Sequence, residues 1–249
     1  MVSLCRIHSA QTLASGVRVS LEASQAHYLR HVMRAKTGTK LALFNAHDGE
    51  WLAEIDFMDK KTMGLTCLSL RRAPLPSLPL TVCFAPVKGG RTETILEKAT
   101  ELGAAIIQPV RTEFTVLPQL NVERAQLIVR EAAEQCERTD LPTILPMRPL
   151  HEVLAEWPAN QPLIYGDESG AHAPFAAGSV RPAQFGILAG PEGGFSPKEF
   201  GLLNACKDAR GVSLGPRILR ADTAILALAT LTTYHWGDWH ALRPAFRRA

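Results

Sequence analysis

Residues 188–200, LAGPEGGFSPKEF, combine the end of an apolar run, a glycine-rich turn and a helix start in one short stretch. The Ser196 side chain can accept a hydrogen bond from the main chain of Glu199, whose carboxylate can reach back in turn. Pro197 suits the first position of a helix. The sequence therefore predicts a strand over 185–189, a glycine-rich loop and a helix that begins at Pro197.

The alternation of apolar strand and amphipathic helix continues around this stretch, from residue 80 onward. The predicted strands span 80–87, 105–110, 163–166, 185–189 and 212–214, and the predicted helices span 92–102, 122–137, 197–207 and 223–236. Such alternation is typical of an α/β domain with a mostly parallel sheet and helices on both faces. The helix at 223–236, TAILALATLTTYHW, is apolar on nearly every face, which predicts burial against the sheet and also against a partner subunit.

The part of the chain before residue 72 is instead rich in short strands. Apolar or alternating runs at 40–45, 50–57 and 63–70 are separated by turn residues, and one helix is expected at 24–33. Several short strands in so few residues predict a small β-barrel. Residues 73–79, APLPSLP, contain three prolines, which a central strand does not accept. We therefore expect a barrel domain over 1–72, a linker over 73–79 and the α/β domain over 80–249.

The composition is that of an ordinary globular protein. Of the 249 residues, 46% are hydrophobic and 20% are charged, which excludes wholesale disorder. No run approaches the length of a membrane span, and no basic segment followed by an apolar one marks a signal peptide. The five cysteines form no CxxC pair and have no neighbouring histidine to complete a zinc site. We expect reduced thiols, no metal and a cytoplasmic location.

Positive charge is concentrated near the N-terminus. Residues 1–80 contain 10 Lys and Arg against 6 Asp and Glu, whereas the remainder contains 17 against 18. This asymmetry points to a polyanionic partner, although counts this small are also compatible with chance. Aromatic residues make up only 6%, which disfavours a continuous base-stacking platform. The candidate RNA-binding residues are Arg6, Arg30, His31, Arg34, Lys36 and Arg91.

Two glycine-containing loops follow predicted strands. In the first, 188–195, three glycines allow the main chain to approach a ligand, beside the partially positive N-terminus of a helix. A tight turn alone needs fewer glycines. In the second, 214–223 (LGPRILRADT), Arg217 and Arg220 suit phosphate or carboxylate binding, or are simply solvated. Asp222 either caps the helix that follows or takes part in chemistry. Neither loop has the GxGxxG spacing of a dinucleotide site.

Four segments, taken in order, resemble the RsmE family of the SPOUT class of methyltransferases. They are GGRTETILEKATELG, EAAEQCER, LAGPEGGFSPKE and LGPRILRADTA, and the N-terminal part with its HVMR segment resembles the PUA-like domain of the same family. The resemblance covers nearly the whole chain. It implies a trefoil-knotted α/β domain, a homodimer and the cofactor S-adenosylmethionine. It also implies methylation of N3 of one uridine in 16S ribosomal RNA of the assembled small subunit.

The resemblance also assigns site residues. The cofactor pocket is expected at Leu188, Ala189, Gly190, Glu192, Gly193, Gly194, Leu214, Gly215, Ile218, Leu219, Arg220 and Thr223. The candidate catalytic residues are Arg220, Asp222, Glu192 and Arg217. Uridine N3 carries a proton, which either Glu192 or Asp222 would accept, while Arg217 or Arg220 would stabilise charge on the neighbouring carbonyls. Asp222 stands where the family usually has Glu, so its reach is one methylene shorter.

Two other classes of protein compete with this interpretation. One is a nucleotide-dependent α/β enzyme, against which the missing GxGxxG and the missing ribose-binding acid argue. The other is a non-enzymatic RNA-binding or ribosome-assembly protein, against which two glycine-rich loops after parallel strands argue. Binding of S-adenosylhomocysteine, compared with NAD, distinguishes them.

Overall fold

The computed structural model describes residues 4–59, 62–169, 171–176, 178 and 181–241. The chain forms two compact units. The first contains the N-terminal residues through Pro76 together with Ala133–Leu141, and the second contains Ser77–Ala132 and Pro142–Leu242. No local pattern in the sequence connects the stretch 133–141 with the N-terminal part, so its place in the first unit is a result of tertiary structure alone.

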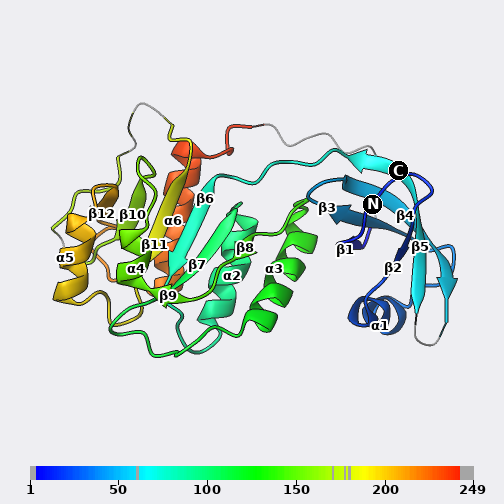
Figure 1. The fold of residues 1–249 in the computed structure, drawn as a ribbon, viewed down its shortest axis with the longest axis horizontal. Coiled ribbons are helices and arrows are strands. Elements are labelled where there is room, and N and C mark those ends of the chain that lie inside the picture. The colour runs from blue at the N-terminus through cyan, green and yellow to red at the C-terminus, as the bar shows by residue number, and fades with distance from the viewer. Residues whose placement is uncertain (1–3, 60–61, 170, 177, 179–180, 242–249) are drawn as a thin grey trace. The chain divides into compact units, whose positions relative to one another are not determined.

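The first unit is a half-barrel of five strands and one helix (Figure 1). Its elements are β1 (Arg6–His8), β2 (Arg18–Ser20), α1 (Ala23–His31), β3 (Lys40–Asn45), β4 (Gly49–Met58) and β5 (Met63–Arg72). The strand order is β1-β3-β4-β5-β2, and only β1 pairs with its neighbour in parallel. Alternating apolar residues of the three long strands pack against α1 and form the core of this unit. The helix contributes Ala26 and Leu29 to that core. The three long strands and the helix were predicted, whereas β1 and β2 are too short to give a periodic pattern.

The second unit contains one parallel sheet. Its strands are β6 (Leu80–Phe84), β7 (Ile106–Arg111), β8 (Thr143–Ile144), β9 (Arg148–Pro149), β10 (Leu163–Gly166), β11 (Phe185–Ala189) and β12 (Ala209–Val212). The order is β12-β10-β11-β6-β7-β8, with β9 also paired to β7, and every pairing is parallel. β12, β10 and β11 are neighbours at one side of the sheet. Because they are parallel, the loops that follow them lie at the same end of the sheet.

Helices cover both faces of this sheet (Figure 1). They are α2 (Arg91–Glu101), α3 (Val122–Cys136), α4 (Leu150–Ala155), α5 (Pro197–Ala205) and α6 (Ala221–Trp236). Along β6, Leu80, Val82 and Phe84 pack into the core that includes α2, α3 and α6, whereas Cys83 packs with α4 and α5. Strands that are apolar on both faces are what a buried parallel sheet requires. The predicted α/β fold class is confirmed.

The helix start that the sequence predicts at Pro197 is confirmed. The Ser196 hydroxyl accepts a hydrogen bond from the Glu199 main-chain N–H, and the Glu199 carboxylate accepts one from the Ser196 N–H at 2.9 Å. The rings of Phe195 and Phe200 pack edge to face across this start, with centroids 5.8 Å apart. The loop between β11 and α5 therefore has a rigid end, because both hydrogen bonds and the ring contact fix it.

The last helix differs from its prediction at its start. It begins at Ala221, two residues earlier than predicted, with Arg220 at the N-cap. Asp222 is therefore not the capping residue but lies inside the first turn. Within the chain, Leu228 and Ala229 of this helix are buried, whereas Leu226 and Leu231 are half-buried. After β12 at the edge, the chain returns to pack α6 against β11, β10 and β6 at the centre of the sheet.

Candidate functional site

An open pocket lies where the loops after β10, β11 and β12 meet. These strands are adjacent and parallel, so their carboxyl ends share one edge of the sheet, where ligands of α/β proteins bind. Main chain, apolar side chains and a few charged groups form the walls. The lining residues are Gly166, Asp167, Glu168, Ala189, Gly190, Gly194, Phe195, Phe200, Leu214, Gly215, Arg217, Leu219, Ala221 and Ala224.

The loop after β11 supplies closely approaching main chain. At Gly194 the backbone has φ of +68°, and a Cβ atom there would lie 2.9 Å from Oε1 of Glu168. At Gly190 a Cβ atom would lie 3.2 Å from Cζ of Phe195. Side chains at these two positions would intrude on the groups that form the pocket wall. The glycines therefore keep the pocket open and leave main-chain N–H and C=O groups accessible to a ligand.

The loop after β10 forms a wall that the sequence did not predict. The buried Asp167 carboxylate accepts hydrogen bonds from the Ser169 N–H at 2.9 Å and the Ser169 hydroxyl at 2.7 Å, and its Oδ2 lies 2.6 Å from Nδ1 of His172. Burial raises the pKa of Asp167, but the Ser169 hydrogen bonds and the contact with His172 outweigh it and lower the pKa. An ionised, fully bonded carboxylate thus fixes this loop. The sequence signal that could have located this loop was the predicted end of its strand at Gly166.

Half of the predicted cofactor residues line the pocket. The lining group consists of Ala189, Gly190, Gly194, Leu214, Gly215 and Leu219. Leu188 instead packs into the core on the α4–α5 face of the sheet. Glu192 and Gly193 lie exposed in the β11 loop, Ile218 is 78% exposed, and Arg220 and Thr223 are exposed at the start of α6.

The four candidate catalytic residues have different surroundings. Arg217 is exposed and lines the pocket, whereas Arg220 lies at the N-cap of α6 with an exposed side chain. Glu192 accepts a hydrogen bond from Nη1 of Arg91 at 2.6 Å, in an ion pair that is partly open to solvent. Asp222 is half-buried, and its Oδ1 is buried without a hydrogen-bond partner among the described residues. Glu192 is thus exposed but ion-paired, whereas Oδ1 of Asp222 is buried and has no partner among the described residues.

The candidate RNA-binding residues belong to both units. His31, Arg34 and Lys36 are exposed at and after the end of α1. Arg30 is half-buried and donates a hydrogen bond to the Asp59 carbonyl. Arg91 lies in the second unit, paired with Glu192.

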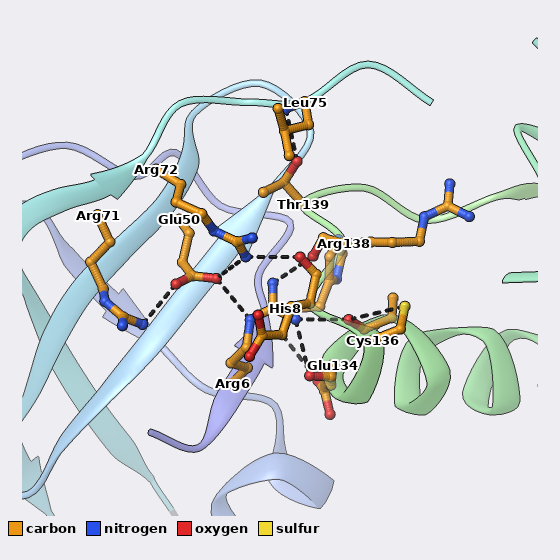
Figure 2. Close-up of polar contacts among 12 residues, drawn as sticks. Arg6, His8, Glu50, Arg71, Arg72, Leu75, Glu134, Cys136, Arg138 and Thr139 are labelled. Atoms are coloured by element: carbon orange, nitrogen blue, oxygen red, sulfur yellow. Dashed lines mark hydrogen bonds and ion pairs between the residues drawn. The ribbon is translucent and has the colours of Figure 1, made fainter. Parts of the chain in front are cut away.

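Arg6 differs from the other candidates because its guanidinium is buried and hydrogen-bonded within the protein (Figure 2). Its Nε donates to Glu50 at 2.8 Å, Nη1 donates to the Ala133 and Glu134 carbonyls, and Nη2 donates to the Arg138 carbonyl. These carbonyls lie at and beyond the end of α3, where a helix leaves acceptors unsatisfied. The Arg6 guanidinium therefore satisfies carbonyl groups at and beyond the C-terminus of α3 and does not face solvent. We remove Arg6 from the RNA-binding set.

Metal ligands and membrane spans were not expected. Among the described residues, no group of three or more His, Cys, Asp or Glu side chains is placed to hold a metal ion. Within the same residues, no helix has both the length and the apolar character that crossing a bilayer requires.

Comparison with known proteins identifies the family. A model of the RNA methyltransferase domain matches residues 73–233, and a model of the RNA methyltransferase PUA domain matches residues 21–63. Ribosomal RNA small subunit methyltransferase E of Rickettsia conorii is 31% identical over 225 residues, which cover 89% of this chain and 91% of the relative. The Synechocystis protein of the same name is 36% identical over 220 residues, which cover 86% of this chain and 72% of that relative.

Solved structures agree with this result. The ribosomal RNA small subunit methyltransferase E of Neisseria gonorrhoeae, bound to S-adenosyl methionine, has a TM-score of 0.85 at 28% identity, covering 95% of this chain and 99% of that chain. A Legionella pneumophila putative methyltransferase in complex with the same cofactor has a TM-score of 0.82 at 27% identity, covering 94% of this chain and 98% of that chain. The SPOUT-type fold and the family suggested by the sequence motifs are both confirmed. The chain belongs to the ribosomal RNA small subunit methyltransferase E family.

Proposed function

We propose that this protein transfers a methyl group from S-adenosylmethionine to N3 of a uridine in 16S ribosomal RNA of the small subunit. The observation that carries the proposal is the pocket at the carboxyl ends of β10, β11 and β12, in a chain whose relatives are ribosomal RNA methyltransferases. Two relatives with the same fold bind S-adenosylmethionine. The cofactor, when bound, supplies an activated methyl group.

The residues of the pocket fit this cofactor. Glycines 190, 194 and 215 let the main chain approach the adenosine, and main-chain N–H and C=O groups can hydrogen-bond to the adenine edge. Leu214 and Leu219 supply apolar surface for the adenine ring, and Arg217 is a cation for the methionine carboxylate. The same walls lack the GxGxxG loop that a nicotinamide dinucleotide would require.

The substrate position requires an unpaired base and a proton acceptor. N3 lies on the pairing edge of uridine, so the base must be single-stranded or flipped out before transfer. In the neutral base N3 bears a proton, which a base or a polarising group must help to remove. Glu192 and Asp222 are both candidates for this role: Glu192 is exposed but bonded to Arg91, whereas Asp222 has a buried Oδ1 without a partner among the described residues. Arg220 lies two residues before Asp222 and can stabilise negative charge on the uracil carbonyls.

Other parts of the chain have supporting roles in this proposal. His31, Arg34 and Lys36 hold the RNA backbone. The half-buried face of α6, with Leu226 and Leu231, packs against a second copy of the chain, as the predicted homodimer requires. The protein acts where ribosomal subunits are assembled, in the cytoplasm. In this proposal the barrel domain predicted over 1–72 binds RNA, and the α/β domain predicted over 80–249 carries the chemistry.

A thermal-shift comparison tests the cofactor assignment. We expect S-adenosylhomocysteine to raise the Tm of the protein and NAD at the same concentration to leave it unchanged, because only ligands that bind the folded state stabilise it. A shift with NAD alone would favour the nucleotide-dependent enzyme. No shift with either ligand would favour an RNA-binding protein without catalysis.

Replacing Arg220 with alanine is expected to lower kcat on the order of 100-fold, the effect of losing one charge-stabilising group at a reaction centre. Binding of S-adenosylhomocysteine should persist, because the Arg220 side chain does not line the pocket. Arg210→Ala, which removes an exposed cation from β12, is the matched control. Wild-type turnover of Arg220→Ala would remove this residue from the mechanism.

A further inference from the structure

The segment between β7 and α3 carries an exposed aromatic ring beside the glycine-rich loop. Phe114 is 44% exposed, and Val116, two residues further on, is 58% exposed. No motif in the sequence marks this segment, and neither side chain lines the cofactor pocket. Packing within the described chain covers only part of the Phe114 ring.

The main chain that bears Phe114 is held firmly. The Glu113 N–H donates to Oε1 of Glu199 at 2.8 Å, and that same carboxylate closes the capping box at the start of α5. The buried Thr112 is bonded to the Thr115 hydroxyl at 2.8 Å through both its N–H and its own hydroxyl. The ring is therefore presented to solvent by a fixed backbone, and ordering it on a ligand costs little conformational entropy.

Phe114 packs directly against the tip of the loop after β11. A Cβ atom at Gly193 would lie 3.1 Å from Cβ and 3.3 Å from Cγ of Phe114. The adjacent residue, Glu192, is ion-paired with Arg91. One side of the loop thus lines the cofactor pocket through Gly190 and Gly194, while its tip lies against Phe114 and holds the Glu192 carboxylate that pairs with Arg91.

We propose that Phe114 is a stacking residue for the unpaired uracil that is to be methylated, which rests on the proposed function. A base taken out of its helix loses its stacking partners, and an aromatic side chain can offer its π-face in their place. Arg91, at the same loop tip, supplies the charge that a nucleotide phosphate needs. A single ring suffices for one flipped base, so the low aromatic content of the chain is no obstacle.

The test measures kcat and KM for methylation of small ribosomal subunits that lack the modification. We expect Phe114→Ala to lower kcat/KM roughly 5- to 150-fold, the fold-change that corresponds to one stacked base. Phe114→Tyr should retain near wild-type kinetics, whereas Phe114→Leu should behave as the alanine variant, because only an aromatic ring stacks. Binding of S-adenosylhomocysteine should be unchanged in all three variants, and Val116→Ala should resemble wild type.

The outcomes separate this inference from the proposed function. An inactive wild-type protein contradicts the proposed function itself. An active wild type with unchanged kinetics in Phe114→Ala, or full rescue by Phe114→Leu, overturns the stacking role alone. Light scattering on the same variants covers the remaining outcome: a Phe114→Ala protein that changes its oligomeric state assigns the ring to contact with a second copy of the chain and also overturns the role.

Discussion

Replacing Glu50 with glutamine is expected to lower the free energy of unfolding of the first unit by about 3–5 kcal/mol, the range for breaking a buried ion pair. Glu50 is fully buried on β4, and its carboxylate accepts hydrogen bonds from Arg6 at 2.8 Å, Arg72 at 2.6 Å and Arg71 at 2.7 Å. Glutamine keeps the shape but removes the charge. The cationic side chains of Arg6 and Arg72 would then remain buried without a counter-charge.

The cost extends beyond the carboxylate because the network also holds the stretch 133–141. Nη2 of Arg72 donates to the Glu137 carbonyl at 2.8 Å, and the Leu75 N–H donates to the Thr139 hydroxyl at 3.0 Å (Figure 2). The Glu50–arginine network therefore connects strand β4 with the stretch 133–141, which lies far away in the chain. Loss of Glu50 should loosen the docking of this stretch as well as the end of β5.

The effect of Glu50 should depend on pH. Burial raises the pKa of Glu50, but the adjacent arginines outweigh it and lower the pKa below its usual value. A carboxyl whose pKa is lower in the folded state stabilises the fold above its unfolded pKa, about 4.3, and loses that contribution as pH falls through the folded pKa. The difference between wild type and Glu50→Gln should thus be full at pH 7 and shrink below about pH 4.

Urea denaturation followed by Trp fluorescence and circular dichroism at several pH values measures this difference. Glu54→Gln, a half-buried position on the same strand, controls for the loss of one negative charge and should change stability little. Equal stability of Glu50→Gln and Glu54→Gln at pH 7 would contradict the role assigned to the buried network.

The second large effect concerns the pocket. Gly190→Val is expected to weaken binding of S-adenosylhomocysteine roughly 5- to 150-fold, equivalent to 1–3 kcal/mol of overpacking. A Cβ atom at Gly190 would already lie 3.2 Å from Cζ of Phe195 and 3.4 Å from the carbonyl carbon of Gly194. Valine must therefore displace either the Phe195 ring or the turn itself. The φ angle at Gly190 is not among the positive ones, so the effect comes from the added atoms.

Isothermal titration with S-adenosylhomocysteine provides the measurement, and circular dichroism checks that the variant is folded. Gly201→Val is the matched control, because this glycine lies on the exposed side of α5 and a Cβ atom there meets nothing within 4 Å. Undiminished affinity in Gly190→Val would place the cofactor elsewhere than between the three loops.

Local sequence signals predicted those parts of the site that depend on neighbouring residues. The residues of the capping box at Ser196, and those of each glycine-rich loop, are close together in the chain. Local sequence patterns therefore predicted both features. The wall contributed by Gly166, Asp167 and Glu168 was missed because this loop has no glycine-rich motif and is fixed by the bonds of Asp167 to Ser169 and His172. The role of Phe114 depends on contact with Gly193, which lies 79 residues away in the chain.

Arg6 illustrates why charge alone misassigns a function. In the sequence it is one cation in a basic region, which indicates RNA binding. Its partners Glu50, Ala133 and Arg138 are 44, 127 and 132 residues away, and only the tertiary fold brings them together. Asp222 was placed at the helix cap for a related reason: the apolar pattern of α6 starts at Thr223, whereas the helix itself starts at Ala221.

The most direct test of the central claim is methyl transfer from labelled S-adenosylmethionine to small ribosomal subunits that lack the modification, with free 16S RNA assayed in parallel and the labelled nucleoside identified by mass. We predict that N3-methyluridine forms on the subunits and that the Gly190→Val protein forms far less of it. Absence of transfer to both substrates by a wild-type protein that binds the cofactor would contradict the proposed RNA target.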